Sequence, residues 1–410
     1  MKNILFICHR IPFPPNKGDK IRSYNILKYL SHRNKVSVGF LIDEAKDLKY
    51  IPNVEQLTEH IFYDQISPLL KKIQSSVLAL STGKPISIPY FYSRRLQIEL
   101  DNFLDQHSID TIVCSSSPSA EYIFRSRHHE NLINNTHLVM DFIDVDSQKW
   151  LQYAERERFP MSVIYKQEAR TLLDYEKRIA KEFDKLFIVS EAEKGLFQSL
   201  IPTDKIHAVS NGVDLDFFNP NHQPDTTFKS PGLVFTGAMD YWPNIDGALW
   251  FIEQVLPLIK KHFPDISLYL VGSKPSEELK KLGKIEGIIV TGFVDDIRDY
   301  IIQADVCVIP LRIARGIQNK VLEAMAMGKA VVSTVDAAEG LHIDMEKDIS
   351  IQNTAETFAS SVVALLQDKE KSKQMGLNAR AVMEKNYSWE NNLRLLDSLL
   401  ENSTNTPDAE

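Results

Sequence analysis

The stretch CVIPLRIARGIQNKVLEAMAMGKAVVST, Cys307–Thr334, carries the pattern that decides the fold. A short apolar run ends at Pro310, a basic loop follows, a helical pattern begins near Ile317, and the apolar run KAVVST closes the stretch. Two short apolar runs joined through a helix are typical of a βαβ unit, whose strands are parallel. The stretch therefore predicts a parallel sheet with helices packed on its faces.

The same alternation of short apolar runs and longer helical patterns extends over almost the whole chain. In the first half it predicts helices such as Ile21–Tyr29 and Val163–Glu182. The strands predicted there are Asn3–Cys8, Val36–Ile42, Thr111–Cys114, His137–Ile143, Leu186–Ser190 and the run IHAVS before Asn211. In the second half the predicted strands are GLVFTG, ISLYLVG, GIIVTGF, ADVCVIP, KAVVST and DISIQ, with a helix over Pro243–His262. Both halves are thus expected to be doubly wound α/β domains.

Length and composition also favour two domains. The chain has 410 residues, of which 43% are hydrophobic, and a single core rarely grows that large. The expected organisation is a Rossmann-like domain over residues 1–211, a proline- and asparagine-rich linker over 212–231, a second such domain over 232–386, a helix over 387–402 and a disordered polar tail over 403–410. Such domains bind ligands at the carboxyl ends of their strands, so we expect a site in a cleft between them.

Charge and cysteine content exclude several classes of protein. A formal net charge of −8 argues against a nucleic-acid partner, which would favour a basic surplus. Cys8, Cys114 and Cys307 lie in apolar runs without a CxxC pair, so buried thiols in a reducing compartment are expected, and no zinc site. No apolar stretch reaches the roughly 18 residues of a transmembrane helix, and the first residues lack the pattern of a signal peptide. We therefore expect a cytoplasmic protein.

The loop and helix in the opening stretch combine side chains that bind a diphosphate. Arg312 and Arg315 lie in the loop, Gly316 permits close backbone approach, and Lys320 lies near the start of the helix. Guanidinium groups, an ammonium group and a helix N-terminus together favour phosphate oxygens. Glu323 follows on the same helix face, where its carboxylate could accept both hydroxyls of a ribose. The alternative is a surface i,i+3 pair of Lys320 and Glu323, worth about 0.2–0.5 kcal/mol.

Two further loops follow predicted strands of the first domain. In ICHRIPFPPNKGDKIRSYN a helix begins directly after Gly18, and its free N–H groups favour an anionic or hydroxyl-rich ligand there. A plain turn with Asp19 as N-cap explains the same residues equally well. In CSSSPSAEY, Ser116 could donate a hydrogen bond to a ligand or cap a helix.

The stretch VMDFIDVDSQKW, Val139–Trp150, contains the pattern D-x-D at Asp144 and Asp146. Such a pair can bind a divalent metal, but it lies in the first domain, away from the basic loop, so no metal is expected. If the strand continues, Asp144 and Asp146 share one face and Asp141 takes the other. Two interpretations stay open: carboxylates that face a ligand, or N-caps of the following segment.

Together these motifs resemble the retaining GT-B glycosyltransferases of family 4, also called group 1. That family carries an E-x7-E signature, and RGIQNKVLEAMAMGKAVV is similar to its second half, with Glu323 on the second glutamate and Arg315 at the first. VSNGVDLDFFNP, VFTGAMDYWPNIDGALWF, VTGFVDDIRDYIIQADVCVIPLR and YSWE are similar to further family motifs, so the resemblance covers nearly the whole chain. DFIDVDSQKW and ARGIQNKVLEAMAMG also resemble a subgroup of sugar transferases found with bacterial exopolysaccharide and protein-sorting (PEP-CTERM) gene clusters.

For the second domain, the resemblance implies a site for a nucleoside-diphosphate sugar. Glu323 would bind the ribose, and the loop of Gly292, Phe293 and Val294 would lie against the base. Most relatives place a basic pair after the first strand of this domain, but here GAMDYWPN, which begins at Gly237, has none. Arg312, Arg315 and Lys320 are therefore expected to supply the positive charge, with Gly316 and Gly18 also facing the donor.

The resemblance implies that the first domain binds the acceptor, which would be a glycan or a lipid-linked molecule. Asp144 falls where relatives have a polar residue that faces the reacting sugar carbon, and Asp146 and Ser116 lie nearby in the expected fold. The candidate catalytic residues are Asp144, Glu323 and Arg315, with no metal and no cofactor. The segment Ser81–Gln97 could contact the inner membrane, although core packing of its aromatic residues is the stronger expectation.

The implied activity is transfer of a hexose-type sugar to a hydroxyl acceptor, with the last helix of the chain crossing back to the first domain. Two other functions remain open on the same fold. A nucleotide-sugar epimerase would change the donor without an acceptor. A non-catalytic sugar-nucleotide-binding protein is the second alternative, because Arg315 replaces a family glutamate.

Overall fold

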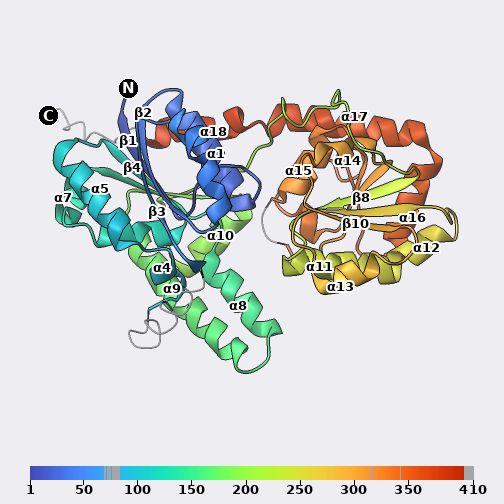
Figure 1. Cartoon of the computed structure of the whole chain (residues 1–410), viewed down its shortest axis with the longest axis horizontal. Helices are drawn as coiled ribbons and strands as arrows, with labels where there is room; N and C mark the ends of the chain where they lie inside the picture. Colours follow the sequence, from blue (N-terminus) through green and yellow to red (C-terminus); the bar gives the residue numbers. More distant parts are fainter. Residues whose placement is uncertain (69–70, 72–74, 76–83, 315–316, 342, 401–410) are drawn as a thin grey trace. The chain divides into compact units, whose positions relative to one another are not determined.

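The computed structural model describes residues 1–68, 71, 75, 84–314, 317–341 and 343–400, without the side chain of Arg156. The chain divides into two compact units (Figure 1). The first comprises Met1–Val209 and the stretch from Leu393 onwards, and the second comprises Ser210–Asn392. Arg315, Gly316 and the tail over 401–410 lie outside the described residues.

Among the described residues, the first unit is built on a seven-stranded parallel sheet of order β3-β2-β1-β4-β5-β6-β7. Its strands are β1 (Asn3–Cys8), β2 (Lys35–Ile42), β3 (His60–Gln65), β4 (Thr111–Ser115), β5 (His137–Asp141), β6 (Lys185–Ile188) and β7 (Ile206–Ala208). The sequence did not predict β3, because its run HIFYDQ is polar at both ends and half-exposed at the edge of the sheet. The predicted strand His137–Ile143 ends earlier, at Asp141.

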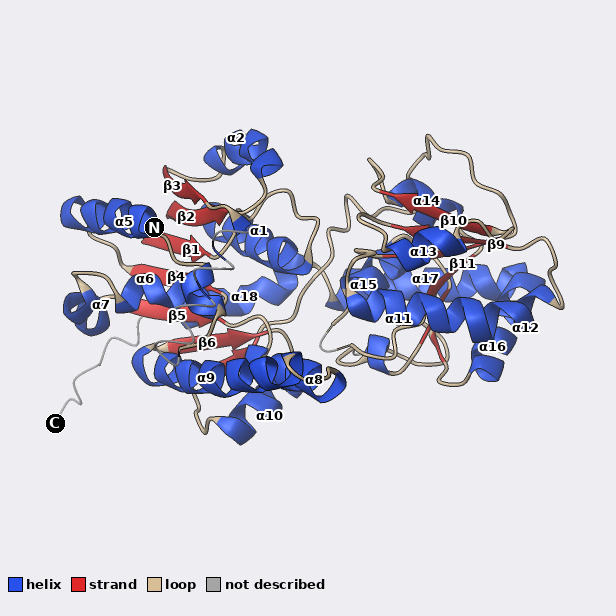
Figure 2. Cartoon of the chain, turned by 60° about the horizontal axis from the view of Figure 1, so that its bottom comes forward, coloured by secondary structure: helices blue, strands red, loops and turns tan. Residues whose placement is uncertain are grey.

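Helices pack on both faces of this sheet (Figure 2). They are α1 (Gly18–Ser31), η1 (Ala45–Tyr50), α2 (Ile51–Glu55), α4 (Ser87–Tyr90), α5 (Arg94–Gln106), η2 (Ser117–Ala120), α6 (Glu121–Phe124), α7 (His129–Asn135), α8 (Asp146–Arg156), α9 (Met161–Glu182) and α10 (Glu191–Leu200). Ser93 and Ser190 begin α5 and α10 as N-caps, since each hydroxyl accepts a hydrogen bond from the backbone three residues later.

The second unit repeats the plan with a parallel sheet of order β10-β9-β8-β11-β12-β13 in the described residues. Its strands are β8 (Gly232–Thr236), β9 (Ser267–Val271), β10 (Ile288–Gly292), β11 (Val306–Ile309), β12 (Val331–Ser333) and β13 (Ser350–Ile351). Its helices are α11 (Trp242–Trp250), η3 (Phe251–Val255), α12 (Leu256–Lys260), α13 (Glu277–Leu282), α14 (Arg298–Gln303), α15 (Asn319–Ala326), η4 (Asp336–Ala338), α16 (Ala355–Gln367) and α17 (Lys369–Asn386). The predicted doubly wound α/β class is therefore confirmed for both units.

Each unit has its own apolar core. Cys8, Cys114 and Cys307 are buried free thiols, as predicted, and Cys114 and Cys307 belong to these cores. The stretch predicted as a linker packs with the second unit: Val213 donates to the carbonyl of Tyr387 at 2.7 Å. No helix in the described ranges combines the length and apolar character needed to cross a bilayer.

Helix α18 (Trp389–Leu400) belongs to both units. At its start, Asn392 donates to the carbonyl of Asn211 at 2.9 Å within the second unit. Farther along, Leu393 and Leu396 are buried in the first unit, and Asp397 accepts a 2.8 Å hydrogen bond from Tyr29.

The strand orders locate where ligands should bind. In each sheet the order turns back at one point, between β1 and β4 in the first unit and between β8 and β11 in the second. Such a point is called the switch point of the sheet. Loops that leave the neighbouring strands there in opposite directions open a crevice beyond the carboxyl ends of the strands.

Candidate functional site

The loops after β8 and β9 approach each other closely in the second unit. Gly237 donates to the carbonyl of Val271 at 3.0 Å, and Met239 donates to that of Ser273 at 2.9 Å. A Cβ on Gly272 would lie 1.7 Å from the Gly237 carbonyl oxygen, and both glycines have positive φ angles. Only glycine permits this approach, which fixes the backbone beside the switch point.

Asn244 and Lys320 complete this side of the crevice. The Asn244 amide donates to the carbonyl of Ala238 at 2.8 Å, while its oxygen accepts a hydrogen bond from the Lys320 ammonium. A side chain on Gly237 would meet Asn244 at 2.7 Å and Lys320 at 3.1 Å. The predicted residues Gly237 and Lys320 are therefore neighbours, and Asn244 is a third member that no local sequence pattern indicated.

Lys320 and Glu323 lie on α15 with partly buried side chains. Burial lowers the pKa of Lys320 to about 8, with Glu323 opposing that shift. Burial raises the pKa of Glu323 to about 7, with Lys320 opposing it. The alternative of an ordinary surface pair does not fit, because both groups have lost much of their hydration.

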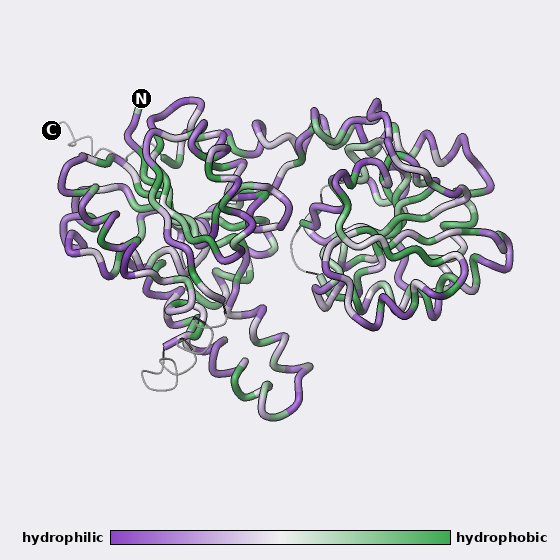
Figure 3. Tube along the Cα trace, viewed as in Figure 1, coloured by the Kyte–Doolittle hydropathy of each residue, from purple (hydrophilic) through white to green (hydrophobic). Residues whose placement is uncertain are grey.

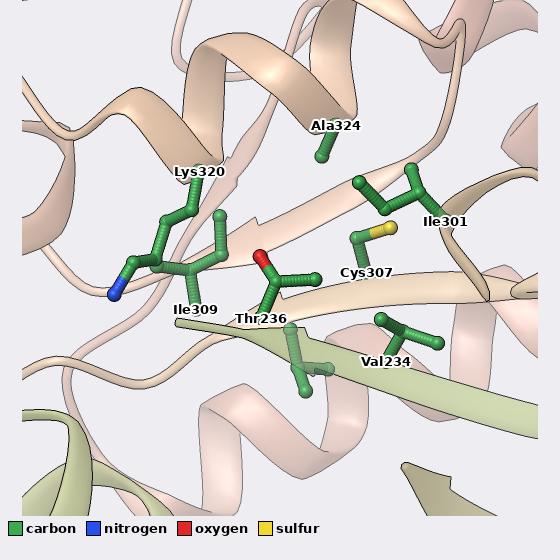
Figure 4. Close-up of a pocket in the computed structure, with 8 residues that line it drawn as sticks. Val234, Thr236, Ile301, Cys307, Ile309, Lys320 and Ala324 are labelled. Atoms are coloured by element: carbon green, nitrogen blue, oxygen red, sulfur yellow. The ribbon is translucent and has the colours of Figure 1, made fainter. Parts of the chain in front are cut away.

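A cavity of about 10 Å³ lies beneath Lys320, room for about one water. It is lined by Val234, Thr236, Ile301, Cys307, Val308, Ile309, Lys320 and Ala324. Figure 4 shows the Lys320 side chain passing over Ile309 with its amine turned away from Cys307 and Ala324. The amine therefore points away from the apolar wall, which is the orientation that an anion-binding group needs.

The remaining predicted donor residues are dispersed around this point. Arg312 is bound by Asp246 of α11 through two hydrogen bonds of 2.6 and 3.0 Å. Arg315 and Gly316 fall outside the described residues, so their predicted roles stay predictions. Gly292 has a φ of 72° in open space, and the following Phe293 is 70% exposed. Val294, next in this loop, packs in part against the core.

In the first unit, charged residues cluster where β1 ends and α1 begins. Asp19 accepts hydrogen bonds from His9 at 3.0 Å and from Arg10 at 2.9 Å, and Arg10 also binds Asp43 at 2.7 Å. Burial opposes ionisation, but His9 and Arg10 together hold the pKa of Asp19 well below its ordinary value. Asp19 is therefore not the N-cap that one interpretation proposed. Exposed Gly18 begins the helix with open space around it.

Two other charged residues of the GDKIR motif anchor α1. Lys20 binds Asp47 at 2.5 Å in the interior. Arg22 has no exposed surface and binds Asp141 at 2.7–2.9 Å while also donating to the Val209 carbonyl. Asp141 is thus a structural partner of Arg22.

The strand does not continue into the D-x-D segment, so the condition under which Asp144 and Asp146 would share one strand face is not met. The strand stops at Asp141, Ile143 takes a φ of 71°, and α8 begins at Asp146. A β-branched residue rarely adopts this conformation, which marks a strained turn. The strain lies next to Asp144, at the carboxyl edge of the sheet.

The N-cap alternative for Asp144 and Asp146 also fails in the structure. Val145 occupies the N-cap position, directly before α8. Backbone N–H groups at this end donate to two buried glutamates, Val145 to Glu193 at 2.8 Å and Ser147 to Glu176 at 3.1 Å. Asp146 is half-buried at this edge, where burial raises its pKa to about 6 and the nearby Asp144 carboxylate adds to the shift.

Ser116 and the aromatic segment lie at the same edge. Ser116 has a φ of 70° and donates its backbone N–H to the Asp141 carbonyl at 2.7 Å, with no helix-capping hydrogen bond from its side chain. Phe91 packs edge-on against His9, with ring centroids 5.0 Å apart, and Tyr90, Phe91 and Tyr92 pack against the core. The core-packing expectation for these aromatic residues therefore holds.

Within the described parts of the chain, one trio of side chains could hold a metal ion: His222, Asp296 and Asp299. His222 lies 2.6 Å from Asp299, and Arg298 binds both carboxylate oxygens of Asp296. These contacts fasten the stretch that contains His222 to α14.

Two Rossmann-like units, the second with cationic and acidic groups at its switch point, define the GT-B class of fold. Residues 230–368 match the sequence family Glycosyl transferases group 1, so the second unit carries such a domain. A Klebsiella pneumoniae protein described as an uncharacterized 44.6 kDa protein in the cps region is 24% identical over 405 residues, 94% of this chain and 97% of that protein. An uncharacterized glycosyltransferase of Methanocaldococcus jannaschii is 25% identical over 244 residues, covering 56% and 61%.

Solved structures agree with this class. Sucrose-phosphate synthase from Thermosynechococcus elongatus superposes with a TM-score of 0.71 at 17% identity, over 97% of this chain and 98% of that one. Anabaena HepE in complex with UDP and glucose gives a TM-score of 0.65 at 14% identity, over 98% and 99%. The predicted GT-B fold is confirmed, and the matches support a glycosyltransferase.

Proposed function

We propose that this protein transfers a sugar, of the hexose type, from a nucleoside-diphosphate sugar to a hydroxyl acceptor, with retention of configuration. The observation that carries the proposal is the group formed by Lys320, Asn244 and Glu323 at the switch point of a group 1 domain. A partly dehydrated ammonium beside strand ends suits a diphosphate, because the charge-assisted hydrogen bond gains strength where water is scarce.

The donor would lie along the second unit. In this proposal Lys320 binds the diphosphate, Glu323 accepts the ribose hydroxyls, and exposed Phe293 lies against the base. Arg315 and Gly316 would complete the phosphate contacts. Arg312 would add positive charge only in part, because Asp246 already binds its guanidinium group.

The acceptor would be held by the first unit. Asp144 and Asp146 are proposed to orient the acceptor hydroxyl and to stabilise positive charge on the transferred sugar. His9 supports this reading, because its Nδ1 atom is buried without a hydrogen-bond partner among the described residues while Asp19 binds its Nε2 atom. Ser116 lies at the same edge. The proposed mechanism requires neither a metal nor a cofactor.

A role in exopolysaccharide assembly, with a glycan or lipid-linked acceptor at the cytoplasmic face of the inner membrane, is the biological setting we propose. The cps-region relative supports it, and the resemblance to family 4 transferases of sorting-associated clusters points the same way.

The test is incubation of pure protein with a panel of nucleoside-diphosphate sugars, with and without oligosaccharide acceptors. Nucleotide release that an acceptor stimulates supports transfer, an altered but intact donor would indicate an epimerase, and binding alone a non-catalytic protein. Glu323→Ala should abolish the release while circular dichroism stays unchanged. Full turnover by this variant would refute the donor-site assignment.

A further inference from the structure

Helices α8 and α9 form an antiparallel hairpin that projects from the first unit (Figure 1). Its base is fixed in the interior, where Glu176 of α9 accepts hydrogen bonds from the backbone and hydroxyl of Ser147. Residues 157–167, the turn and the first two turns of α9, are called the hairpin tip below. Not one of them is fully buried, and burial begins only at Glu168.

The hairpin tip exposes large apolar side chains within six positions of sequence. Phe159 is 82% exposed, Val163 57%, Ile164 39% and Met161 38%. Figure 3 shows hydrophobic residues at this end of the hairpin. Single exposed apolar residues are common on proteins. A cluster of them at the end of a projecting element indicates a surface that binds a membrane or another molecule.

Aromatic residues lie directly behind the tip. The rings of Trp150 and Tyr165 are 5.1 Å apart, and Tyr153 lies 5.8 Å from Trp150. All three are partly buried between the two helices. Tryptophan and tyrosine concentrate where hydrocarbon meets water, because an apolar ring and a polar tip suit the two sides of that boundary.

Charge near the tip differs from that of the whole chain, whose net charge is −8. Near the tip, Arg158, Lys166 and Arg170 are exposed, as are the acidic residues Glu155 and Glu157, so these five described residues have a basic surplus. Glu168 is buried, and its carboxylate accepts the backbone N–H groups of Ile86 and Ser87 at 2.5 and 3.0 Å.

We propose that the hairpin tip inserts into the surface of an anionic phospholipid bilayer. Apolar side chains at the end, an aromatic layer behind them and cations around them are the three elements of an interfacial anchor. The sequence offered a different candidate for membrane contact, Ser81–Gln97, whose described aromatic residues pack in the core. The inference does not depend on the transferase activity, and vesicle binding is measured without any donor.

The anchor has a geometric consequence for the first unit. Helix α8 has 11 residues, so about 16 Å separate its first turn, which carries Asp146, from the hairpin tip. A lipid-linked hydroxyl acceptor would therefore reach the Asp144–Asp146 edge from a bound membrane surface over a short distance.

The test is co-flotation of the full chain with vesicles of phosphatidylglycerol and phosphatidylcholine in equal parts, compared with phosphatidylcholine alone. The protein should float with the anionic vesicles at least about tenfold more strongly than with neutral ones. The double variant Phe159→Ser with Val163→Ser should lose about tenfold or more of that binding. Leu377→Ser on α17 is the matched control, because Leu377 is 55% exposed and lies in the other unit.

A second measurement reports insertion directly. The native cysteines are buried, so a fluorophore on Val163→Cys labels the hairpin tip selectively, and its emission should shift to the blue with anionic vesicles. Equal flotation of the double variant and the wild type, or no flotation at all, would overturn the proposal. Self-association in sedimentation equilibrium that the double variant abolishes, without vesicle binding, would likewise overturn it in favour of a protein interface.

Discussion

Replacing Lys320 by methionine should weaken the binding of a nucleoside diphosphate by about 10- to 150-fold. The ammonium group is held by Asn244 beside the strand ends, where burial has already lowered its pKa to about 8. A hydrogen bond from a charged donor contributes about 1.5–3 kcal/mol, and about 1.4 kcal/mol corresponds to tenfold in affinity. Methionine keeps an unbranched side chain, shorter only by the terminal amine, and removes the charge and the donor.

The pKa of Lys320 adds a second signature. Only the protonated amine binds phosphate, and the protonated fraction falls about tenfold between about pH 7 and about pH 9 when the pKa is about 8. The diphosphate itself is fully ionised in most of this range. Wild-type affinity should therefore fall with rising pH, whereas the affinity of Lys320→Met should stay low and nearly constant.

Isothermal titration with UDP, GDP, ADP and CDP at both pH values measures the two effects, using the nucleotide that the wild type binds best. Lys329→Met is the control, because Lys329 is also a partly buried lysine of lowered pKa but precedes β12 at the amino end of the sheet. A variant Lys320→Met with wild-type affinity, or a wild type indifferent to pH, would refute the phosphate role of Lys320.

Three further predictions concern stability. Asp141→Asn should cost about 3–5 kcal/mol in urea unfolding, since it leaves the fully buried Arg22 without its counter-charge; a loss below about 1 kcal/mol would contradict this. Burial raises the pKa of Glu176 to about 8. The stability that this residue contributes is therefore full below about pH 4 and is lost as the pH rises towards 8. Glu176→Gln should flatten this decline, which is measured as the urea midpoint of unfolding across that pH range. Gly272→Ala should lower the melting temperature and weaken nucleotide binding, because its Cβ would lie 1.7 Å from the Gly237 carbonyl; an unchanged melting curve would show that the two loops move apart easily.

Local pattern was enough to predict the α/β class. Strands such as Asn3–Cys8 are covered on both faces, so they read as continuous apolar runs. The polar edge strand β3 lacks that signal and was missed. The end of β5 was misplaced because the chain turns at Ile143 through a conformation that isoleucine seldom adopts. Only the surrounding fold can impose such a turn.

The candidate site was predictable only where its residues are close in sequence. Lys320 and Glu323 share one helix face, so spacing paired them. Asn244 comes from another helix, 76 residues from Lys320, and nothing in its neighbourhood indicated the contact. Glu176 and Glu193, which accept the N–H groups at the start of α8, were missed for the same reason. From the sequence alone, the nearby Asp144 and Asp146 were the only candidates for that capping role.

The last turns of α18 belong to the first unit, so that unit cannot finish folding until the whole second unit has been synthesised. The first unit includes Leu393 and Leu396, but the ribosome must first make Ser210–Asn392, which takes roughly 10–40 s at typical rates of synthesis. Throughout that interval the side chains of the first unit that bury these leucines are not yet covered by them. A nascent chain stopped at Asn392 should accordingly be captured by chaperones, and release should follow once the last turns of the helix emerge.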